Sequence, residues 1–288
     1  MNEYIRLCRP KHYIKNLLLF APLVFGSALS AFPMVLLAFC GFSLICSSVY
    51  IFNDLHDREA DAAHPVKCKR PLASGAVSPQ AATRLMLALL LIGGALTALS
   101  CRAYPPAFAI PVIYVSLNIL YTLHLKNVVL ADVAVLASGY FLRLFLGALI
   151  SAIVISPWMY LVVLSISLFL GFGKRLGEIR SNGTAARKSL EKYNEQFLES
   201  CLDVFGTTAL VFYSLWASSS EIIANSGHYM LWSVPLVILL YLRYRYLLEH
   251  NSCDDPVEII FGDKPVIFMA LLYIAYILLV CFKILPSR

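Results

Sequence analysis

The sequence predicts an all-α integral membrane protein, a single polytopic domain of residues 1–288 with nine transmembrane helices. Of the 288 residues, 60% are hydrophobic and only 14% are charged, and the mean hydropathy is +0.76. A soluble globular chain carries about 25% charged residues. Apolar runs recur along the whole chain, near the length of roughly 20 residues that a bilayer-spanning helix needs. This composition excludes a soluble enzyme, a disordered chain and a disulfide-rich secreted module.

The expected helices are apolar runs bounded by charged residues or by Pro and Gly. They cover residues 17–32, 34–52, 80–99, 105–121, 128–150, 157–172, 201–220, 230–247 and 265–284. Only a short break near Pro33 separates the first two runs. The basic N-terminal arm is followed by no small-residue cleavage pattern, so we expect the first run to be retained.

The basic residues predict the orientation in the membrane. If the N-terminus is cytoplasmic, the loops after the second, fourth, sixth and eighth runs lie on the same side. Of the 23 Lys and Arg residues, three fall on the other side (Arg102, Lys283, Arg288) and one falls inside a run (Arg143). The positive-inside rule then places these loops in the cytoplasm and the C-terminus outside. We expect the protein in the inner (plasma) membrane of the cell. Anionic lipid headgroups account for the net charge of +6, so we expect no nucleic-acid partner.

The acidic residues follow the same distribution, since of 17 Asp and Glu only Glu221 lies near the far side. The positive-inside rule concerns Lys and Arg and does not predict this bias. A second cause is needed, and we expect a chemical site at the cytoplasmic ends of the helices.

The loop after the second run holds the strongest candidate for that site. Asp54, Asp57 and Asp61 stand at positions i, i+3 and i+7, so they share one face if the helix continues through Asp61. Three carboxylates repel one another unless they hold a cation, and all-oxygen ligands suit Mg²⁺. A solvated acidic helix end is the alternative interpretation.

Basic residues follow the three carboxylates directly. Lys67, Lys69 and Arg70 can neutralise a diphosphate, Arg in bidentate fashion and Lys as a point charge. Alone, such a run is typical of a loop that contacts anionic lipid. Beside the carboxylates it favours a site for a diphosphate and its metal ion.

This segment resembles the first aspartate-rich motif of the UbiA superfamily of intramembrane prenyltransferases. The residues that match are Asn53-Asp54-x-x-Asp57-x-x-x-Asp61 and Lys67-x-x-Arg70-Pro71-Leu72-x-Ser74-Gly75. The resemblance implies nine helices around a central cavity, Mg²⁺ holding a diphosphate at the cytoplasmic mouth, and a lipid chain in the cavity. Asp54, Asp57 and Asp61 are then the catalytic metal ligands, and Asn53 is a substrate-binding residue with Lys67 and Arg70.

Two further polar groups follow along the chain. Tyr121 and Lys126, after the fourth run, resemble the tyrosine-to-lysine motif of the superfamily, although both are also ordinary interfacial anchors. The fifth run carries Asp132 near its cytoplasmic end and Arg143 well inside. An arginine within the bilayer is costly and faces a cavity or a partner, so Arg143 is a candidate substrate-binding residue. A structural ion pair is the alternative.

The loop after the sixth run bears on the subtype. Aromatic-acceptor members carry a second aspartate-rich motif there, whereas this chain has Gly173-Lys174-Arg175-Leu176-Gly177-Glu178. Together with the arm from Arg9 to Asn16 and the stretch from Asp132 to Arg143, this loop resembles the decaprenyl-phosphate phosphoribosyltransferase branch. That branch implies a transferase that moves 5-phosphoribose from phosphoribosyl pyrophosphate to a polyprenyl phosphate, in the synthesis of arabinose donors for cell-envelope glycans. The expected substrate-binding residues are then Lys15, Lys67, Arg70, Lys126, Lys174, Arg175 and Glu178.

Two alternatives stay open. One is a prenyltransferase that moves a prenyl chain from a prenyl diphosphate to an aromatic or quinone-precursor acceptor. The other is a transporter or channel, for which we find no convincing internal repeat. The eight Cys and six His show no metal-ligand spacing and no nucleophilic arrangement. In the last inner loop, we expect Asp254 or Asp255 to cap a short helix.

Overall fold

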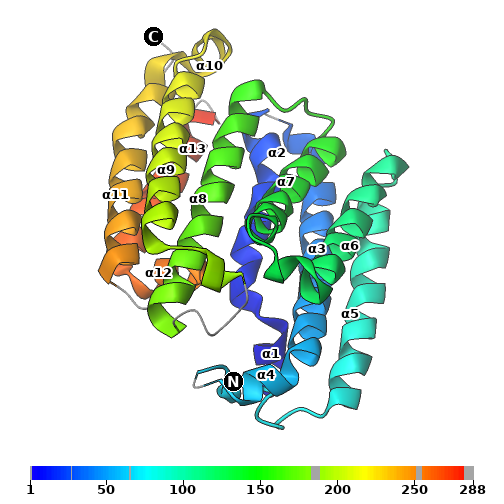
Figure 1. The fold of residues 1–288 in the computed structure, drawn as a ribbon. Coiled ribbons are helices and arrows are strands. Elements are labelled where there is room, and N and C mark those ends of the chain that lie inside the picture. The colour runs from blue at the N-terminus through cyan, green and yellow to red at the C-terminus, as the bar shows by residue number, and fades with distance from the viewer. Residues whose placement is uncertain (1, 27, 65, 183–188, 251–254, 282–288) are drawn as a thin grey trace. The chain divides into compact units, whose positions relative to one another are not determined.

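The structure is a computed structural model and is described for residues 2–26, 28–64, 66–182, 189–250 and 255–281. These residues form helices and connecting segments, with no strand among them (Figure 1). Eight helices in this part of the chain are long and apolar enough to cross a membrane. The chain is therefore a multi-pass membrane protein, as its composition predicts.

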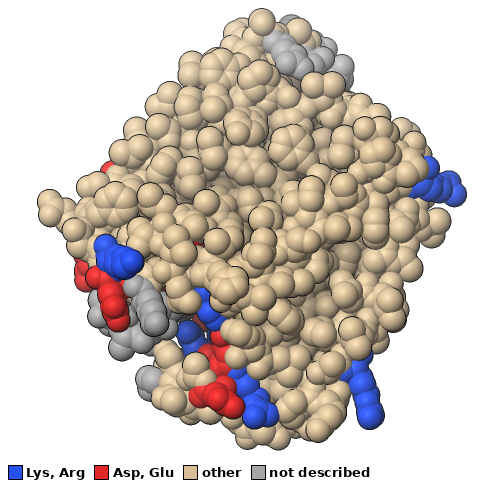
Figure 2. All heavy atoms as spheres, turned by 45° about the vertical axis from the view of Figure 1, so that its right-hand side comes forward, with Lys and Arg blue, Asp and Glu red and all other residues tan. Residues whose placement is uncertain are grey.

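The helices follow the order of the apolar runs. The long ones are α3 (Phe32–His56), α5 (Pro79–Ser100), α6 (Ala109–Leu123), α7 (Ala131–Ser151), α8 (Pro157–Asn182), α9 (Glu195–Ala217), α11 (Val234–His250) and α13 (Lys264–Cys281). The short ones are α1 (Glu3–Cys8), α2 (Ala21–Phe25), α4 (Arg58–Ala62), α10 (Ser220–Ser226) and α12 (Pro256–Gly262). Figure 2 shows a face that is largely uncharged, with acidic and basic side chains in a few patches, as contact with lipid requires.

The first expected span, 17–32, is not one continuous α-helix. A 3-10 helix, η1 (Pro10–Phe20), leads into the five residues of α2. Pro10 opens this segment and Pro22 lies within α2, and a proline has no backbone N–H to donate to a helix. The described residues thus contain eight long apolar helices, and the expected count of nine is not confirmed.

The sixth helix is longer than the sequence predicts. We expected it to end at residue 172, with Lys174, Arg175 and Glu178 in a loop, but α8 continues to Asn182 and carries all three. Its extension buries Leu176 completely in the hydrophobic core. Leu176 lies one helical turn after Phe172 and therefore on the same face of the helix. The polar residues between them made the sequence look like a loop.

The contacts divide the chain into two compact units. Unit 1 comprises residues 1–23, 28–125 and 142–154, and unit 2 comprises residues 24–27, 126–141 and 155–288. Helix α7 contributes its first half to unit 2 and its second half to unit 1.

Unit 1 is built around α3, which packs against α5, α6 and η1. The crossing of α3 and α5 depends on two glycines, because a Cβ on Gly41 would lie 2.8 Å from the carbonyl oxygen of Gly93. A Cβ on Gly93 would lie 2.6 Å from the carbonyl oxygen of Gly41. Small residues of this kind let helix backbones approach closely in a bilayer, where apolar burial against lipid drives little association.

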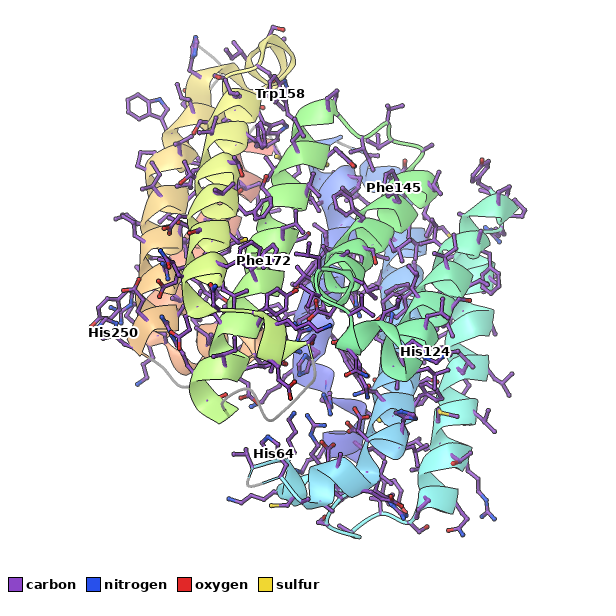
Figure 3. The ribbon with its side chains drawn as sticks, in the orientation of Figure 1. His64, His124, Phe145, Trp158, Phe172 and His250 are labelled. Carbon is purple, nitrogen blue, oxygen red and sulfur yellow. The ribbon has the colours of Figure 1, made fainter. Side chains whose placement is uncertain are left out.

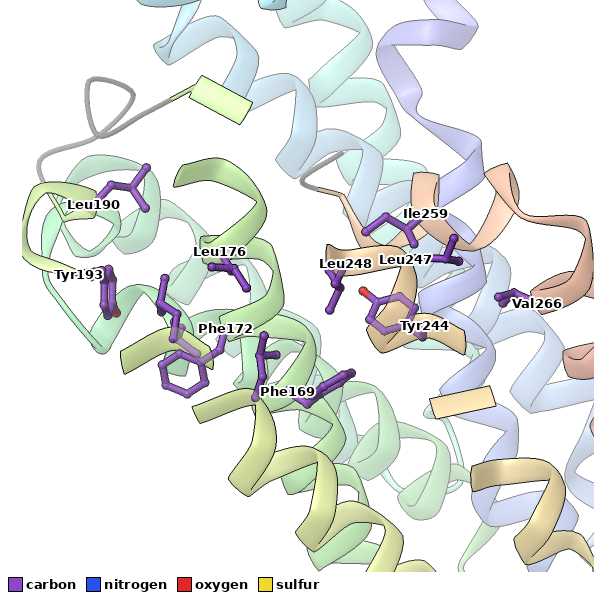
Figure 4. Close-up of a cluster of buried hydrophobic side chains, with 13 residues drawn as sticks. Phe169, Phe172, Leu176, Leu190, Tyr193, Tyr244, Leu247, Leu248, Ile259 and Val266 are labelled. Atoms are coloured by element: carbon purple, nitrogen blue, oxygen red, sulfur yellow. The ribbon is translucent and has the colours of Figure 1, made fainter. Parts of the chain in front are cut away.

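Unit 2 has its main hydrophobic cluster around α8, α9, α11 and α12 (Figure 4). The buried members are Val133, Phe169, Phe172, Leu176, Leu190, Tyr193, Leu198, Leu202, Tyr244, Leu247, Leu248, Ile259 and Val266. Within it the rings of Phe172 and Phe205 are stacked, with centroids 5.6 Å apart. This packing fixes the extension of α8 beyond Phe172, which carries Lys174, Arg175 and Glu178.

The cap expected in the last inner loop is confirmed for Asp255. Helix α12 begins at Pro256, and Asp255 Oδ1 accepts a hydrogen bond of 2.9 Å from the Val257 N–H. Its neighbour Asp254 lies outside the described residues.

Candidate active site

The aspartate-rich segment of unit 1 is formed by the end of α3 and by α4. Helix α3 ends at His56 and α4 begins at Arg58, so the continuous helix that would place all three carboxylates on one face is interrupted. The interruption is a turn at Asp57, with φ −89° and ψ 4°. The Asp57 N–H still donates to the Asn53 carbonyl, and the Asp61 N–H donates to the Asp57 carbonyl, at 2.9 and 2.8 Å. Helical hydrogen-bond spacing therefore continues across the turn.

Asp54 and Asp61 converge on one cationic group. Their exposed fractions are only 2% and 6%. Arg70 Nη1 lies 3.2 Å from Asp54 Oδ1 and 2.6 Å from Asp61 Oδ2. The structure thus brings together three residues that the sequence assigns to the site. Asp57, the third predicted ligand, is half-buried at the turn between them.

Arg9 is a second cation at this cluster. Its Nη2 lies 2.5 Å from Asp54 Oδ1, and its guanidinium carbon lies 5.3 Å from the ring centroid of Tyr50. Arg9 adopts the left-handed conformation, with φ 51°. That conformation costs a non-glycine residue roughly 1–2 kcal/mol, and in it the Arg9 guanidinium meets both Asp54 and Tyr50. Sequence reasoning did not identify this pairing, although a buried carboxylate needs a cation and the basic N-terminal arm could supply one.

Asn53 and Lys67 flank the carboxylates. Asn53 Oδ1 accepts a hydrogen bond of 3.2 Å from Thr122 Oγ1, which links the end of α3 to the end of α6 beside Tyr121. Lys67 opens the 3-10 helix η3 (Lys67–Lys69), and its N–H donates to Nδ1 of His64 at 3.3 Å. Figure 3 shows His64 on the loop that follows α4. These bonds fix the segments that carry the predicted substrate-binding residues.

The donor set of this cluster suits Mg²⁺. Among the described residues, no group of three or more His, Cys, Asp or Glu side chains is already arranged to hold a metal ion. Two buried carboxylates do converge on one cationic group, and carboxylate oxygens are the ligands that Mg²⁺ prefers. Asp54 and Asp61 would hold such a cation, and Arg70 Nη1 contacts the same two carboxylates.

A second polar cluster in unit 1 surrounds Arg143, which is 5% exposed. Arg143 Nε lies 2.6 Å from Asn16 Oδ1, and Nη2 lies 3.3 Å from Cys46 Sγ and 3.4 Å from the Tyr114 hydroxyl. Its guanidinium carbon also lies 5.2 and 5.1 Å from the ring centroids of Phe42 and Tyr114. These partners are neutral. Arg143 thus has the protein partners that an arginine inside a span requires, and a role in substrate binding stays a prediction.

The polar cluster of unit 2 joins α7 to the extension of α8. Arg175 Nε lies 2.8 Å from Asp132 Oδ2, and Arg175 Nη1 donates to Glu178 Oε2. Arg175 and Asp132 are fully buried, and Glu178 is 3% exposed. Neighbouring Lys174 is half-buried. Arg175 and Glu178, both predicted substrate-binding residues, are therefore paired with each other one helical turn apart.

Tyr193 extends this cluster to the segment that carries Lys126. The Tyr193 hydroxyl donates to Asp132 Oδ1 at 2.8 Å and accepts from the Leu130 N–H at 2.7 Å. Burial raises the pKa of Tyr193, so its hydroxyl stays protonated and can donate. Ser189 Oγ donates to the carbonyl oxygen of Lys126 at 2.9 Å. The segment after α8 thereby anchors the backbone on which Lys126 stands.

The predicted site residues therefore fall into separate groups. Asp54, Asp61 and Arg70 form one cluster and Arg143 belongs to another, both within unit 1. Arg175 and Glu178 form a cluster in unit 2, and Lys15 is half-buried on η1 of unit 1. The single cytoplasmic mouth that the sequence predicts for all of them stays a prediction.

Comparison with known proteins gives consistent results. A profile of the UbiA prenyltransferase family matches residues 17–272. The chain is 31% identical over 281 residues to decaprenyl-phosphate phosphoribosyltransferase of Mycobacterium tuberculosis, covering 94% of this chain and 91% of that protein. It is 32% identical over 295 residues to the protein of the same name from Mycolicibacterium smegmatis, covering 95% and 89%. Its fold is similar to that of a UbiA homolog from Archaeoglobus fulgidus solved with GPP and Mg²⁺, with a TM-score of 0.71, 19% identity, and coverage of 98% of this chain and 100% of that one.

Proposed function

Because the chain belongs to the UbiA prenyltransferase family and is a membrane transferase, we propose that it moves 5-phosphoribose from phosphoribosyl pyrophosphate to a polyprenyl phosphate. A phosphate oxygen of the lipid forms a bond to the anomeric carbon of the ribose, and the bond from that carbon to pyrophosphate breaks. The lipid phosphate is already anionic near neutral pH, so the reaction needs no strong general base. This agrees with a site rich in cations and carboxylates.

The observation that carries the proposal is the convergence of Asp54 and Asp61 beside Arg70, in a chain so similar to named phosphoribosyltransferases. We assign Asp54, Asp57 and Asp61 as the residues that hold Mg²⁺. A bound Mg²⁺ would supply Lewis-acid stabilisation of the leaving pyrophosphate, worth several kcal/mol. Lys67 and Arg70 would neutralise the remaining charge of that group.

The other cations serve the remaining phosphates. The acceptor lipid carries one phosphate, and the donor carries a 5-phosphate on its ribose in addition to its diphosphate. We assign the acceptor phosphate and the 5-phosphate to Lys15, Lys126, Lys174 and Arg143. Arg175 is assigned a positioning role, because Asp132 and Glu178 already hold its guanidinium. Through Asp132 and Tyr193 it would fix the backbone that carries Lys126.

The orientation belongs to the same proposal. We place the N-terminus and the aspartate-rich segment in the cytoplasm, since Arg102 is among the few basic residues of the opposite loops. Single cysteines at Arg102 and at Lys69, both exposed, test this in a chain without its native cysteines. A membrane-impermeant thiol reagent added outside intact cells should label the first position and not the second.

Transfer is tested with the full chain in nanodiscs containing Mg²⁺. Phosphoribosyl pyrophosphate with a polyprenyl phosphate should release pyrophosphate and yield a lipid that carries labelled ribose phosphate. Asp57→Asn should abolish turnover, whereas Glu59→Gln, an exposed neighbour on α4, should retain it. Turnover only with a prenyl diphosphate and an aromatic acid would instead identify the alternative prenyltransferase.

A further inference from the structure

Arg9 and Arg70 both pair with Asp54, but the chain holds them differently. Arg9 stands in a left-handed conformation between α1 and η1, with its guanidinium also beside the ring of Tyr50. Arg70 follows η3 in an extended conformation, with φ −68° and ψ 146°. Its side chain is 28% exposed, against 22% for Arg9. Arg9 is therefore held from two sides, whereas Arg70 reaches the carboxylates from a loop.

Arg70 is also the cation that joins the two carboxylates. A single nitrogen, Nη1, contacts Oδ1 of Asp54 and Oδ2 of Asp61. Asp54 would keep Arg9 as a partner if Arg70 moved away, while Asp61 would lose this ion pair. Two buried carboxylates that lie close together repel each other unless a cation or a shared proton offsets their charge. With Arg9 retained, a divalent cation in place of Arg70 leaves one excess positive charge at the cluster, which an anionic ligand can neutralise.

We infer that Arg70 is an exchangeable counter-ion, which bridges Asp54 and Asp61 until a divalent cation displaces it and then binds the phosphate oxygens of the donor. The inference rests on the proposed function, because it assumes that these aspartates hold the metal ion. It adds an order of events at the site. Arg9 stays on Asp54 throughout, and only Arg70 changes its partner.

The exchange couples the two ligands. A metal ion alone must displace a guanidinium from two carboxylates, and the guanidinium gains no new anionic partner. A metal ion with a diphosphate gives Arg70 such a partner, in a charge-assisted contact. Metal and diphosphate should therefore strengthen each other's binding, by the same factor in both directions.

The test measures Mn²⁺ binding to the full chain in nanodiscs by electron paramagnetic resonance, with and without pyrophosphate. Affinities are corrected for Mn²⁺ chelation by pyrophosphate in solution. Wild-type protein should bind Mn²⁺ about tenfold more tightly with pyrophosphate, within the usual range of such couplings. Arg70→Gln should bind Mn²⁺ alone more tightly than wild type does. Pyrophosphate should raise its Mn²⁺ affinity by a clearly smaller factor than in wild type, because only the direct attraction between the metal ion and pyrophosphate remains.

Arg9→Gln is the matched control, because it removes the other guanidinium from the same carboxylate. Its Mn²⁺ affinity can rise because a positive charge is lost. Pyrophosphate should still raise that affinity by the same factor as in wild type. If Arg70→Gln does not fold, Arg70→Lys replaces it. A lysine keeps the charge but lacks the planar fork, so the factor by which pyrophosphate raises its Mn²⁺ affinity should lie between those of wild type and Arg70→Gln.

The results separate the inference from the proposed function. An Arg70 variant that retains the wild-type factor would overturn the exchange and leave the metal site intact. Mn²⁺ binding that persists in Asp54→Asn and in Asp61→Asn would show that these aspartates do not hold the metal ion. It would overturn the proposed metal site and the exchange together. We expect both aspartate variants to lose Mn²⁺ binding, and of the two arginine positions only Arg70 to show a reduced pyrophosphate effect when it is substituted.

Discussion

Arg175 Nε lies 2.8 Å from Asp132 Oδ2, and neither side chain has any exposed surface. Glu178 adds a second carboxylate to the same guanidinium. A buried ion pair contributes little compared with a well-packed apolar pair, but breaking it leaves an uncompensated charge. The residue that the sequence assigns to a phosphate is thus required first for the integrity of unit 2.

Arg175→Gln is expected to destabilise the protein by about 3–5 kcal/mol, because it leaves two buried carboxylates without their cation. Thermal unfolding in detergent, followed by circular dichroism, measures the effect. Lys174→Gln is the control on the same helix, since Lys174 is half-buried. It should unfold close to the wild-type temperature while raising KM for a phosphorylated substrate. Equal loss of stability in the two variants would contradict the distinction between them.

The sequence predicts those parts of the structure that depend on local pattern. Run length and hydropathy locate the long helices, and the spacing of Asp54 and Asp61 places both carboxylates in one cluster. The extension of α8 is missed because Gly173 and Lys174 suggest a loop, while the burial of Leu176 decides for a helix. Tertiary packing there outweighs the local polarity of the chain.

Partners that are distant in the sequence cannot be predicted in this way. Arg9 meets Asp54 across 45 positions, and Asn16 meets Arg143 across 127. A single sequence shows that a buried charge needs a partner, but the fold determines which side chain is within reach. The sequence therefore identifies most of the charged residues that matter, whereas only the structure shows which side chain each of them contacts.

Asn16 provides a test of the pairing with Arg143. Asn16→Leu removes the acceptor of the Arg143 Nε bond and the donor to Ser43 Oγ, which are 2.6 and 2.8 Å long. A hydrogen bond to a charged group is worth about 1.5–3 kcal/mol, so we expect a loss of that size. Asn16→Asp should be less harmful, since one carboxylate oxygen accepts from Arg143 and the other can accept from the Ser43 hydroxyl. Unfolding in detergent compares the two variants, and an equal loss would contradict this arrangement.

Tyr193 is predicted to stabilise the segment that contains Leu130 and Lys126. Tyr193→Phe removes the hydroxyl shared by Asp132 and the Leu130 N–H, at an expected cost of about 1–3 kcal/mol for the groups left unsatisfied. Hydrogen exchange of residues 126–132 should accelerate. Tyr160→Phe is the control, because Tyr160 is 42% exposed and keeps its ring contact with Phe141. Unchanged exchange in Tyr193→Phe would show that the hydroxyl does not hold this segment.

The start of α13 should respond to acid through Asp263. Hydrogen bonding from Arg243 lowers the pKa of Asp263, with the Val266 N–H contributing to the same carboxylate. The folded pKa lies below the unfolded value of about 3.9, so the stabilisation is present above that value and is lost as the pH falls through the folded pKa. Asp263→Asn should therefore be less stable than wild type at neutral pH, and the difference should shrink as the pH falls below about 4.

Unfolding midpoints of the two proteins between pH 7 and pH 3 measure this difference. Arg243→Gln removes the same interaction from the other side and should reproduce the pH dependence of Asp263→Asn. Because the side chain of Arg243 is 37% exposed, solvent and salt screen the pair, and the effect should weaken as salt is added. Stability of Asp263→Asn that matches wild type at every pH would mean that Asp263 acts only as the cap of α13, through its hydrogen bond from the Val266 N–H, which an asparagine can also accept.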